Sequence, residues 1–211
     1  MSVEVLGISG SPVENSNTDR LIRAMSEATG REAEFVKLSR IQVRPCVACK
    51  QCVSDNVCKV QDDFPALAEK VKKAKALIIG AYTPYKQVDG FTKALLERFW
   101  SLRHVNNLLR GKLCATVLMY LTPESGESVN RLLARGLAEM ENMEMVGQVM
   151  AQGNLPCVTC GVGDDCEMSG LHRRYGPDAK ASDIAYVRVE DQKEVWDEAI
   201  RIGREIGRRI G

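Results

Sequence analysis

The stretch that decides the fold is VLGISGSPVENSNT, which spans residues 5–18. The apolar run over residues 3–8 predicts a β-strand, and apolar residues recur at helical spacing from Asn17 to Thr29. A loop rich in glycine and hydroxyl groups joins the two. Such a loop before a helix N-terminus favours a phosphate, because backbone N–H groups and the helix dipole both attract an anion. The candidate phosphate ligands are Ser9, Ser11, Ser16, Asn17 and Thr18.

The loop also indicates which kind of phosphate would bind. It contains neither the G-x-G-x-x-G pattern of dinucleotide sites nor the G-x-x-x-x-G-K-S/T pattern of nucleoside triphosphate sites, so a mononucleotide phosphate fits it better. One alternative stays open at this point. The serine and asparagine side chains could simply cap the following helix, although a cap needs only one of them.

The rest of the chain alternates strand-like runs with helical patterns. Five strands alternating with helices predict an α/β fold with a doubly wound parallel sheet. We expect a single domain over residues 1–211, interrupted by insertions at 40–61 and 153–188 that are longer than ordinary connections. The further strands are predicted at residues 33–38, 76–81, 113–121 and 145–151, and the further helices at 64–74, 91–102, 129–140 and 190–210.

The composition excludes several classes of protein. The 29 basic and 28 acidic residues nearly cancel, which disfavours nucleic acid or an anionic membrane surface as a partner. The chain has no apolar run long enough for a membrane span and no signal-peptide pattern, so we expect a cytoplasmic protein. Eight cysteines in a reducing compartment point to metal or redox chemistry rather than to disulfides.

Four of the cysteines form the compact motif Cys46-x2-Cys49-x2-Cys52-x5-Cys58. An iron–sulfur cubane needs four converging thiolates, and two-residue gaps let one tight loop supply them. The five-residue gap contains turn-forming residues, which allows the fourth cysteine to fold back. Zinc and a metal-free C-x-x-C dithiol remain alternatives, although structural zinc sites usually pair two separated knuckles.

A second group, Cys157, Cys160 and Cys166, lies in the later insertion. Three cysteines leave a tetrahedral site incomplete, so a metal there would need a further ligand such as His172 or Asp164. A second metal or cluster and an oxidisable thiol loop are both compatible with this spacing.

Beyond these motifs, the sequence from Val5 to Pro12, followed by Ser16-Asn17-Thr18, resembles the opening of the NAD(P)H-dependent FMN reductase superfamily of flavodoxin-like proteins. The resemblance implies FMN, with its phosphate held by this loop, although Val13 stands where the family usually has arginine. It also implies that the loops after the strands at 76–81 and 113–121 lie beside the flavin. The residues concerned are Thr83, Pro84 and Tyr85 in the first loop, and Thr122, Pro123, Glu124 and Gly126 in the second.

The cysteine motif between the second strand and second helix is similar to that of the iron–sulfur flavoproteins. This resemblance implies a 4Fe–4S cluster on Cys46, Cys49, Cys52 and Cys58, and a homodimer or homotetramer. It implies an oxidoreductase that moves electrons between one- and two-electron carriers, such as ferredoxin, NAD(P)H, a quinone or oxygen species. No catalytic side chain is assigned. An FMN or quinone reductase without a cluster, and a metal-binding or redox-sensing protein, remain the alternatives.

Overall fold

A computed structural model describes residues 3–211 and contains one five-stranded sheet in which every pairing is parallel. The strands are β1 (Val5–Ser9), β2 (Ala33–Lys37), β3 (Ala76–Tyr82), β4 (Leu113–Tyr120) and β5 (Glu144–Gln152). Their spatial order is β2-β1-β3-β4-β5. This is the order of flavodoxin-like sheets, in which ligands bind at the carboxyl ends of the strands. The predicted α/β fold is therefore confirmed.

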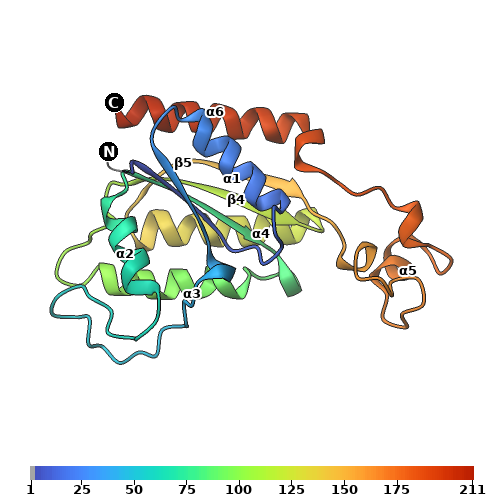
Figure 1. The fold of residues 1–211 in the computed structure, drawn as a ribbon, viewed down its shortest axis with the longest axis horizontal. Helices are drawn as coiled ribbons and strands as arrows, with labels where there is room; N and C mark the ends of the chain where they lie inside the picture. Colours follow the sequence, from blue (N-terminus) through green and yellow to red (C-terminus); the bar gives the residue numbers. More distant parts are fainter. Residues whose placement is uncertain (1–2) are drawn as a thin grey trace.

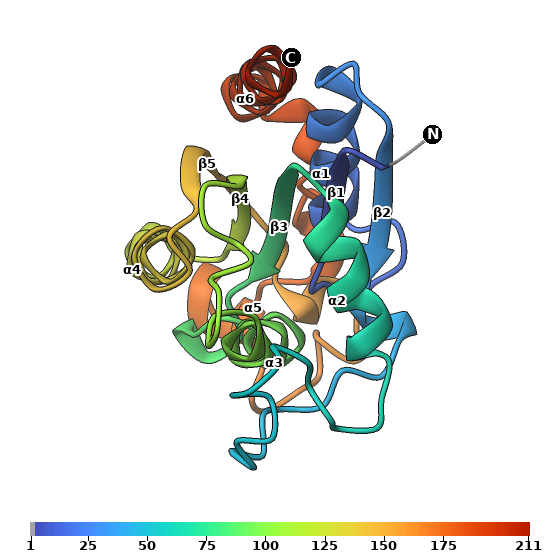
Figure 2. The same cartoon turned by 90° about the vertical axis from the view of Figure 1, so that its left-hand side faces the viewer.

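Helices cover both faces of the sheet (Figures 1 and 2). The helices that do so are α1 (Asn17–Ala28), α2 (Phe64–Lys73), α3 (Gly90–Phe99), α4 (Pro123–Arg135) and α6 (Lys193–Ile210), whereas the short α5 (Gly170–Tyr175) lies apart from the sheet in the insertion after β5. The helices α1 and α6 pack on one face, whereas α2, α3 and α4 pack on the other. Within residues 3–211, each helix is too short or too polar to span a membrane.

The central strand β3 shows why both faces are covered. Leu77 and Ile79 point into the core beneath α2, α3 and α4, while Ala76 and Ile78 point into the core beneath α1 and α6. All four side chains are fully buried. A strand that is apolar on both faces is typical of a parallel sheet with helices on either side.

The C-terminal helix α6 lies close against α1, and glycine makes this approach feasible. A Cβ atom at Gly203 would lie 2.3 Å from the Met25 carbonyl oxygen and 2.8 Å from the Ala28 Cβ. No larger residue fits there without separating the two helices. The helix α6 therefore supports α1, whose N-terminus carries the predicted phosphate loop.

The start of α4 differs from the prediction. The helix begins at Pro123 rather than at residue 129, and Thr122 takes the N-cap position. Proline is favoured in the first helical turn because its missing N–H needs no partner there. The residues from Pro123 to Glu127, which the sequence analysis treated as a loop, are thus helical. The helix ends at Arg135 and continues as a π-helical turn, Gly136–Met140.

The two predicted insertions leave the sheet at different places (Figure 1). The cysteine-rich stretch 40–61 connects β2 to α2 and passes beside α3. The later stretch 153–188 follows β5 and carries the short helix α5, which the sequence did not reveal. Because it leaves the carboxyl end of β5, this second insertion is placed to reach the ligand-binding edge of the sheet.

Candidate functional site

A cavity of about 430 Å³ lies at the carboxyl edge of the sheet. The segments that follow β1, β3, β4 and β5 all contribute to its walls. Its size is within the range of small-molecule and cofactor sites. Six of the predicted flavin-site residues line it, namely Ser11, Ser16, Asn17, Thr18, Thr83 and Pro84.

The loop after β1 is fixed by a buried carboxylate. Ser16 caps α1 by accepting a hydrogen bond from the Asp19 backbone N–H at 3.1 Å, and the Asp19 carboxylate accepts one from the Ser16 N–H at 3.1 Å. This is a capping box. Ser9 donates its hydroxyl hydrogen to Asp19 at 2.6 Å, so its side chain faces Asp19 behind the loop. The capping alternative therefore describes Ser16, but not the other residues of the loop.

Lys37 completes this buried network. Its ammonium lies 2.6 Å from the Asp19 carboxylate and donates to the Val13 carbonyl at 2.7 Å. Both charged side chains are almost fully buried. A paired lysine neutralises Asp19, which would otherwise repel an anion at the N-terminus of α1. Val13 is 61% exposed and its side chain carries no charge, so this position supplies no cation to the loop.

Three hydroxyl groups in the cavity are free to bind a ligand. Ser11, Thr18 and Thr83 are all buried residues that line the cavity, yet their hydroxyl groups make no hydrogen bond to any residue within 3–211. Their oxygen atoms are open to the cavity rather than enclosed by protein, so they can donate to or accept from a bound ligand. The neutral donors at the start of α1 fit a phosphate, as the sequence predicted.

The other predicted flavin-site residues lie outside the cavity. Tyr85 is 99% exposed and has a left-handed backbone, with φ 50°. Thr122, Pro123 and Glu124 lie at the start of α4, and Gly126 packs beneath the Tyr120 ring. Four residues that the sequence analysis missed take their place at the ends of β3 and β4, namely Tyr82, Met119, Tyr120 and Leu121.

The later insertion forms one wall of the cavity, which we call the cover segment (residues 153–188). Its place after β5, on the same carboxyl edge as the flavin loops, predicts a role near the flavin, whereas the individual residues that line the cavity were not predicted. The cavity-lining residues of the cover segment are Gly153, Asn154, Leu155, Pro156, Thr159 and Tyr186.

Amide side chains anchor the cover segment at its two ends. Asn154 donates to the Val187 carbonyl at 2.8 Å and accepts from the Val187 N–H at 2.7 Å, which joins the beginning of the segment to its end. Asn17 donates to the same carbonyl at 2.9 Å and accepts from the Val189 N–H at 3.2 Å. Asn17 thus ties the cover segment to the N-terminus of α1.

We expect the substitution Asn154→Ala to weaken flavin binding about tenfold, by speeding dissociation. It removes two hydrogen bonds, which contribute about 0.5–1.5 kcal/mol each, and a factor of ten corresponds to about 1.4 kcal/mol. The measurement is the FMN dissociation constant by fluorescence titration of the apoprotein. Gln148→Ala, which removes an exposed amide side chain from the preceding strand β5, is the matched control. Equal affinities for both variants would contradict an anchoring role for Asn154.

The four cysteines of the first motif surround a single hollow beside α3. Cys46, Cys49, Cys52 and Cys58 all line it, together with Arg98 and other residues near the end of α3. Its free volume of about 10 Å³ is room for roughly one water molecule. Within residues 3–211, no three His, Cys, Asp or Glu side chains lie close enough together to hold a metal ion. The four cysteines therefore border one hollow, and binding a cluster there would require the loop to rearrange.

The backbone of the cysteine loop alternates in handedness. Ala48 and Lys50 have positive φ angles of 52° and 59°, although neither is glycine, while Cys49 between them does not. Such alternation turns successive N–H groups to one side and forms concave sites for anions, including iron–sulfur clusters. The Ala48 N–H already points to the Cys46 sulfur at 3.4 Å. The chemistry of the loop thus fits a thiolate-bound cluster.

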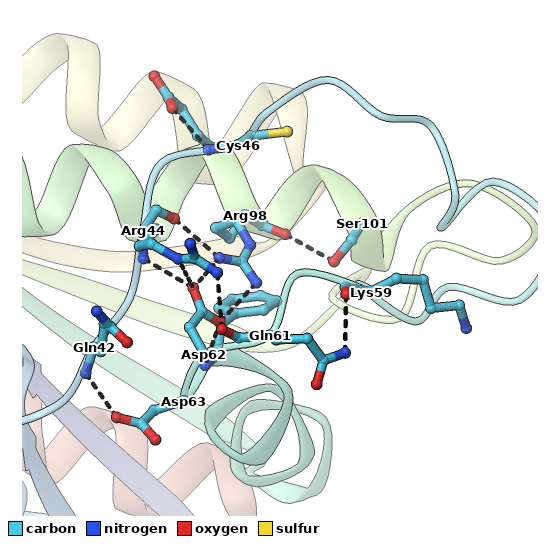
Figure 3. Close-up of polar contacts among 11 residues, drawn as sticks. Gln42, Arg44, Cys46, Lys59, Gln61, Asp62, Asp63, Arg98 and Ser101 are labelled. Atoms are coloured by element: carbon cyan, nitrogen blue, oxygen red, sulfur yellow. Dashed lines mark hydrogen bonds and ion pairs between the residues drawn. The ribbon is translucent and has the colours of Figure 1, made fainter.

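The two ends of the cysteine loop are held together by a neck of hydrogen bonds (Figure 3). The Gln42 N–H donates to Asp63 at 2.7 Å, and the Arg44 N–H donates to Asp62 at 2.9 Å. Asp62 also accepts from the Phe64 N–H at 3.0 Å, so it caps α2 in place of Asp63, which occupies the N-cap position. Because every partner belongs to the protein, the neck does not depend on a metal.

The electrostatics of the loop favour a cation among the thiols. Burial raises the pKa of the Cys52 thiol, and the neighbouring thiols of Cys58, Cys49 and Cys46 raise it further. Burial would also raise the pKa of Asp62, but hydrogen bonds from Arg98 and the backbone outweigh it and lower that pKa. A bound metal would stabilise the crowded thiolates that otherwise repel one another.

The second cysteine group is not assembled into a metal site among the described residues. The Cys157 sulfur accepts a hydrogen bond from the Gly170 N–H at 3.3 Å, and the Cys160 thiol faces the Cys157 carbonyl at 3.5 Å. The proposed further ligand Asp164 instead accepts from the Ala181 N–H at 2.7 Å. These contacts hold the cover segment in shape.

Comparison with known proteins identifies the family to which the sequence is similar. The model of the NADPH-dependent FMN reductase family matches residues 3–155. The chain is 29% identical over 148 residues to an iron–sulfur flavoprotein of Methanocaldococcus jannaschii, covering 69% of this chain and 76% of that protein. It is 31% identical over 157 residues to an iron–sulfur flavoprotein of Archaeoglobus fulgidus, covering 73% of this chain and 72% of that one.

A solved structure supports the fold. RosB, determined with bound 8-demethyl-8-formylriboflavin-5'-phosphate, superimposes with a TM-score of 0.66 over 99% of this chain and 80% of its own. The two sequences are only 14% identical, so this likeness concerns the fold alone.

Proposed function

The chain belongs to the NADPH-dependent FMN reductase family, and on this premise we propose that it is an electron-transfer protein that binds FMN and a 4Fe–4S cluster. The observation that carries the proposal is the gathering of Cys46, Cys49, Cys52 and Cys58 around one hollow. The likeness to iron–sulfur flavoproteins supports the same assignment.

The cavity at the carboxyl edge of the sheet would hold FMN. The free hydroxyls of Ser11 and Thr18 and the N-terminus of α1 would bind its phosphate, and Thr83 and Pro84 would contact the rest of the cofactor. Asn154 and Asn17 would keep the cover segment in place and exclude water from the bound flavin. FMN exchanges two electrons singly or together, whereas a 4Fe–4S cluster exchanges one.

The helix α3 links the two proposed sites. Asp89 at its start accepts a hydrogen bond at 3.3 Å from the N–H of Tyr82, which lines the cavity, and Arg98 near its end lines the cysteine hollow. Nine residues of helix span about 14 Å, at a rise of 1.5 Å per residue. The helix thus holds the two sites at a fixed separation along its axis within one chain.

Electrons would enter through one cofactor and leave through the other. The donor and acceptor would be small redox molecules or redox proteins, such as NAD(P)H, ferredoxin, a quinone or oxygen species, and the protein would act as a homodimer or homotetramer. The likeness to the FMN reductase family supports a nicotinamide as one partner.

The test is an anaerobic absorption spectrum combined with assays of FMN, iron, sulfide and zinc on one sample. We expect about one FMN and four iron with four sulfide per chain, as one cluster requires. About eight iron per chain would implicate Cys157, Cys160 and Cys166 as well. Zinc without flavin would overturn the proposal in favour of a metal-binding protein.

An NAD(P)H-dependent FMN or quinone reductase without a cluster is the second candidate function. The match of the NADPH-dependent FMN reductase family model over residues 3–155 is the observation that supports it. Stopped-flow mixing with NADPH under anaerobic conditions distinguishes the two. FMN without iron, together with fast hydride transfer to the flavin, would support the reductase.

A further inference from the structure

Arg98 is the largest fully buried side chain of the chain's described part, residues 3–211. Its guanidinium and the Asp62 carboxylate are both wholly inaccessible to solvent. One terminal nitrogen, Nη1, donates to Asp62 at 2.6 Å and to the Arg44 carbonyl at 3.0 Å, and the other, Nη2, donates to Asp62 at 3.0 Å (Figure 3). This bidentate pair joins α3 to the neck of the cysteine loop.

The third nitrogen of Arg98 has no such partner. Its Nε is buried and makes no hydrogen bond to any residue within 3–211. A buried donor without an acceptor costs about 1–3 kcal/mol, and more when the group is charged. Such a group in a folded protein therefore points to a functional role or a missing partner.

Arg98 borders the cysteine hollow. Arg98 lines the hollow together with Cys58, whereas Asp62 does not line it. The positive end of the buried pair thus faces the thiols, and its negative end faces the neck.

We propose that Arg98 is the positioning residue of the cluster site, where its buried guanidinium faces Cys58, retains the cluster and raises its reduction potential. This inference rests on the proposed function. Four thiolates give the site a net negative charge, and reduction adds another electron. A fixed cation at short range in a poorly solvated site stabilises the reduced form more than the oxidised form.

The experiment uses three variants of the cofactor-loaded protein. Arg98→Lys keeps the charge but removes the Nε donor and the planar fork. The double variant Arg98→Met/Asp62→Asn removes both charges together, so that no unpaired charge stays buried. Arg44→Gln is the matched control, because Arg44 lies beside the same Asp62 at 4.0 Å but is 52% exposed. Iron and sulfide content, thermal unfolding and the cluster midpoint potential by EPR-monitored titration are measured for each.

We expect the double variant to lower the cluster potential by at least 59 mV, a tenfold change in the one-electron equilibrium, or to lose iron while keeping FMN and its fold. The cluster potential and iron content of Arg98→Lys should lie between those of the double variant and the wild type. The same two values for Arg44→Gln should equal those of the wild type. Should the double variant fail to fold, an unchanged potential in Arg98→Lys would overturn the role of the donor.

Full iron content and an unchanged potential in a folded double variant would overturn the proposal and show that Arg98 has only a structural role. Failure of the proposed function has a different signature. A wild-type protein without iron and sulfide would overturn the cluster itself, and the metal assay reveals this before any potential is measured.

Discussion

Replacing Cys52 with serine is expected to remove the iron and sulfide from the protein while leaving FMN bound. Cys52 is the buried cysteine of the motif, with 6% of its surface exposed, so water cannot readily replace its sulfur as a ligand. The cavity at the carboxyl edge of the sheet shares no residue with the cysteine hollow. The expected change is from about four iron per chain to nearly none, measured by iron assay and by loss of cluster absorption.

Cys114→Ala is the matched control for this prediction. Cys114 is also a buried cysteine, but it lies in β4, where burial raises the pKa of its thiol to about 12. Cys114 packs in the apolar core and does not line the cysteine hollow, so it is not placed to act as a cluster ligand. This variant should keep all its iron. Full iron content in Cys52→Ser would show that the motif does not bind a cluster through this residue.

The substitution Gly10→Ala is expected to weaken FMN binding at least tenfold and to destabilise the fold. A Cβ atom at Gly10 would lie 2.0 Å from the Thr92 hydroxyl oxygen and 2.6 Å from an Asp89 carboxylate oxygen. Asp89 is completely buried and caps α3 by accepting from the Thr92 N–H at 2.8 Å, so it has no room to retreat. Overpacking of this kind costs about 1–3 kcal/mol. Either the phosphate loop or the start of α3 must move.

Gly90→Ala provides a control at the start of the same helix. No atom lies within 4 Å of a Cβ at Gly90, and alanine suits a helical position. We expect this variant to bind FMN as tightly as the wild type and to unfold at the same temperature or slightly above it. The FMN dissociation constant and the thermal midpoint should be measured for both variants. Wild-type values for Gly10→Ala would show that the loop is not confined by Asp89.

Much of the fold could be predicted because its signals are local. Apolar periodicity located all five strands and most helices, and the glycine- and hydroxyl-rich loop located the first segment of the cavity. The start of α4 was missed because Thr122-Pro123 can open either a turn or a helix. Because this stretch was predicted to be a loop, Glu124 and Gly126 were expected beside the flavin. In the structure Tyr120 lines the cavity, and Gly126 packs against its ring.

The contacts that anchor the cover segment and the burial of Arg98 could not be predicted for a different reason. The hydrogen bond between Asn17 and Val187 joins residues 170 positions apart, and nothing in the local sequence of either indicates the other. Arg98 and Asp62 are ordinary charged residues in sequence, and only the path of the cysteine loop past α3 buries them together. Long-range contacts of this kind depend on the complete fold.

The large sequence separation of these contacts also affects the order in which the site can form during translation. The phosphate loop and α1 are synthesised well before Val187, Glu190 and Gly203, which bind or pack against α1. At about 5–20 residues per second, a nascent chain spends roughly ten seconds or more with α1 lacking these partners. The cavity can therefore close only after the cover segment and α6 have been synthesised, so the loop that begins the flavin site waits for the segments that complete it.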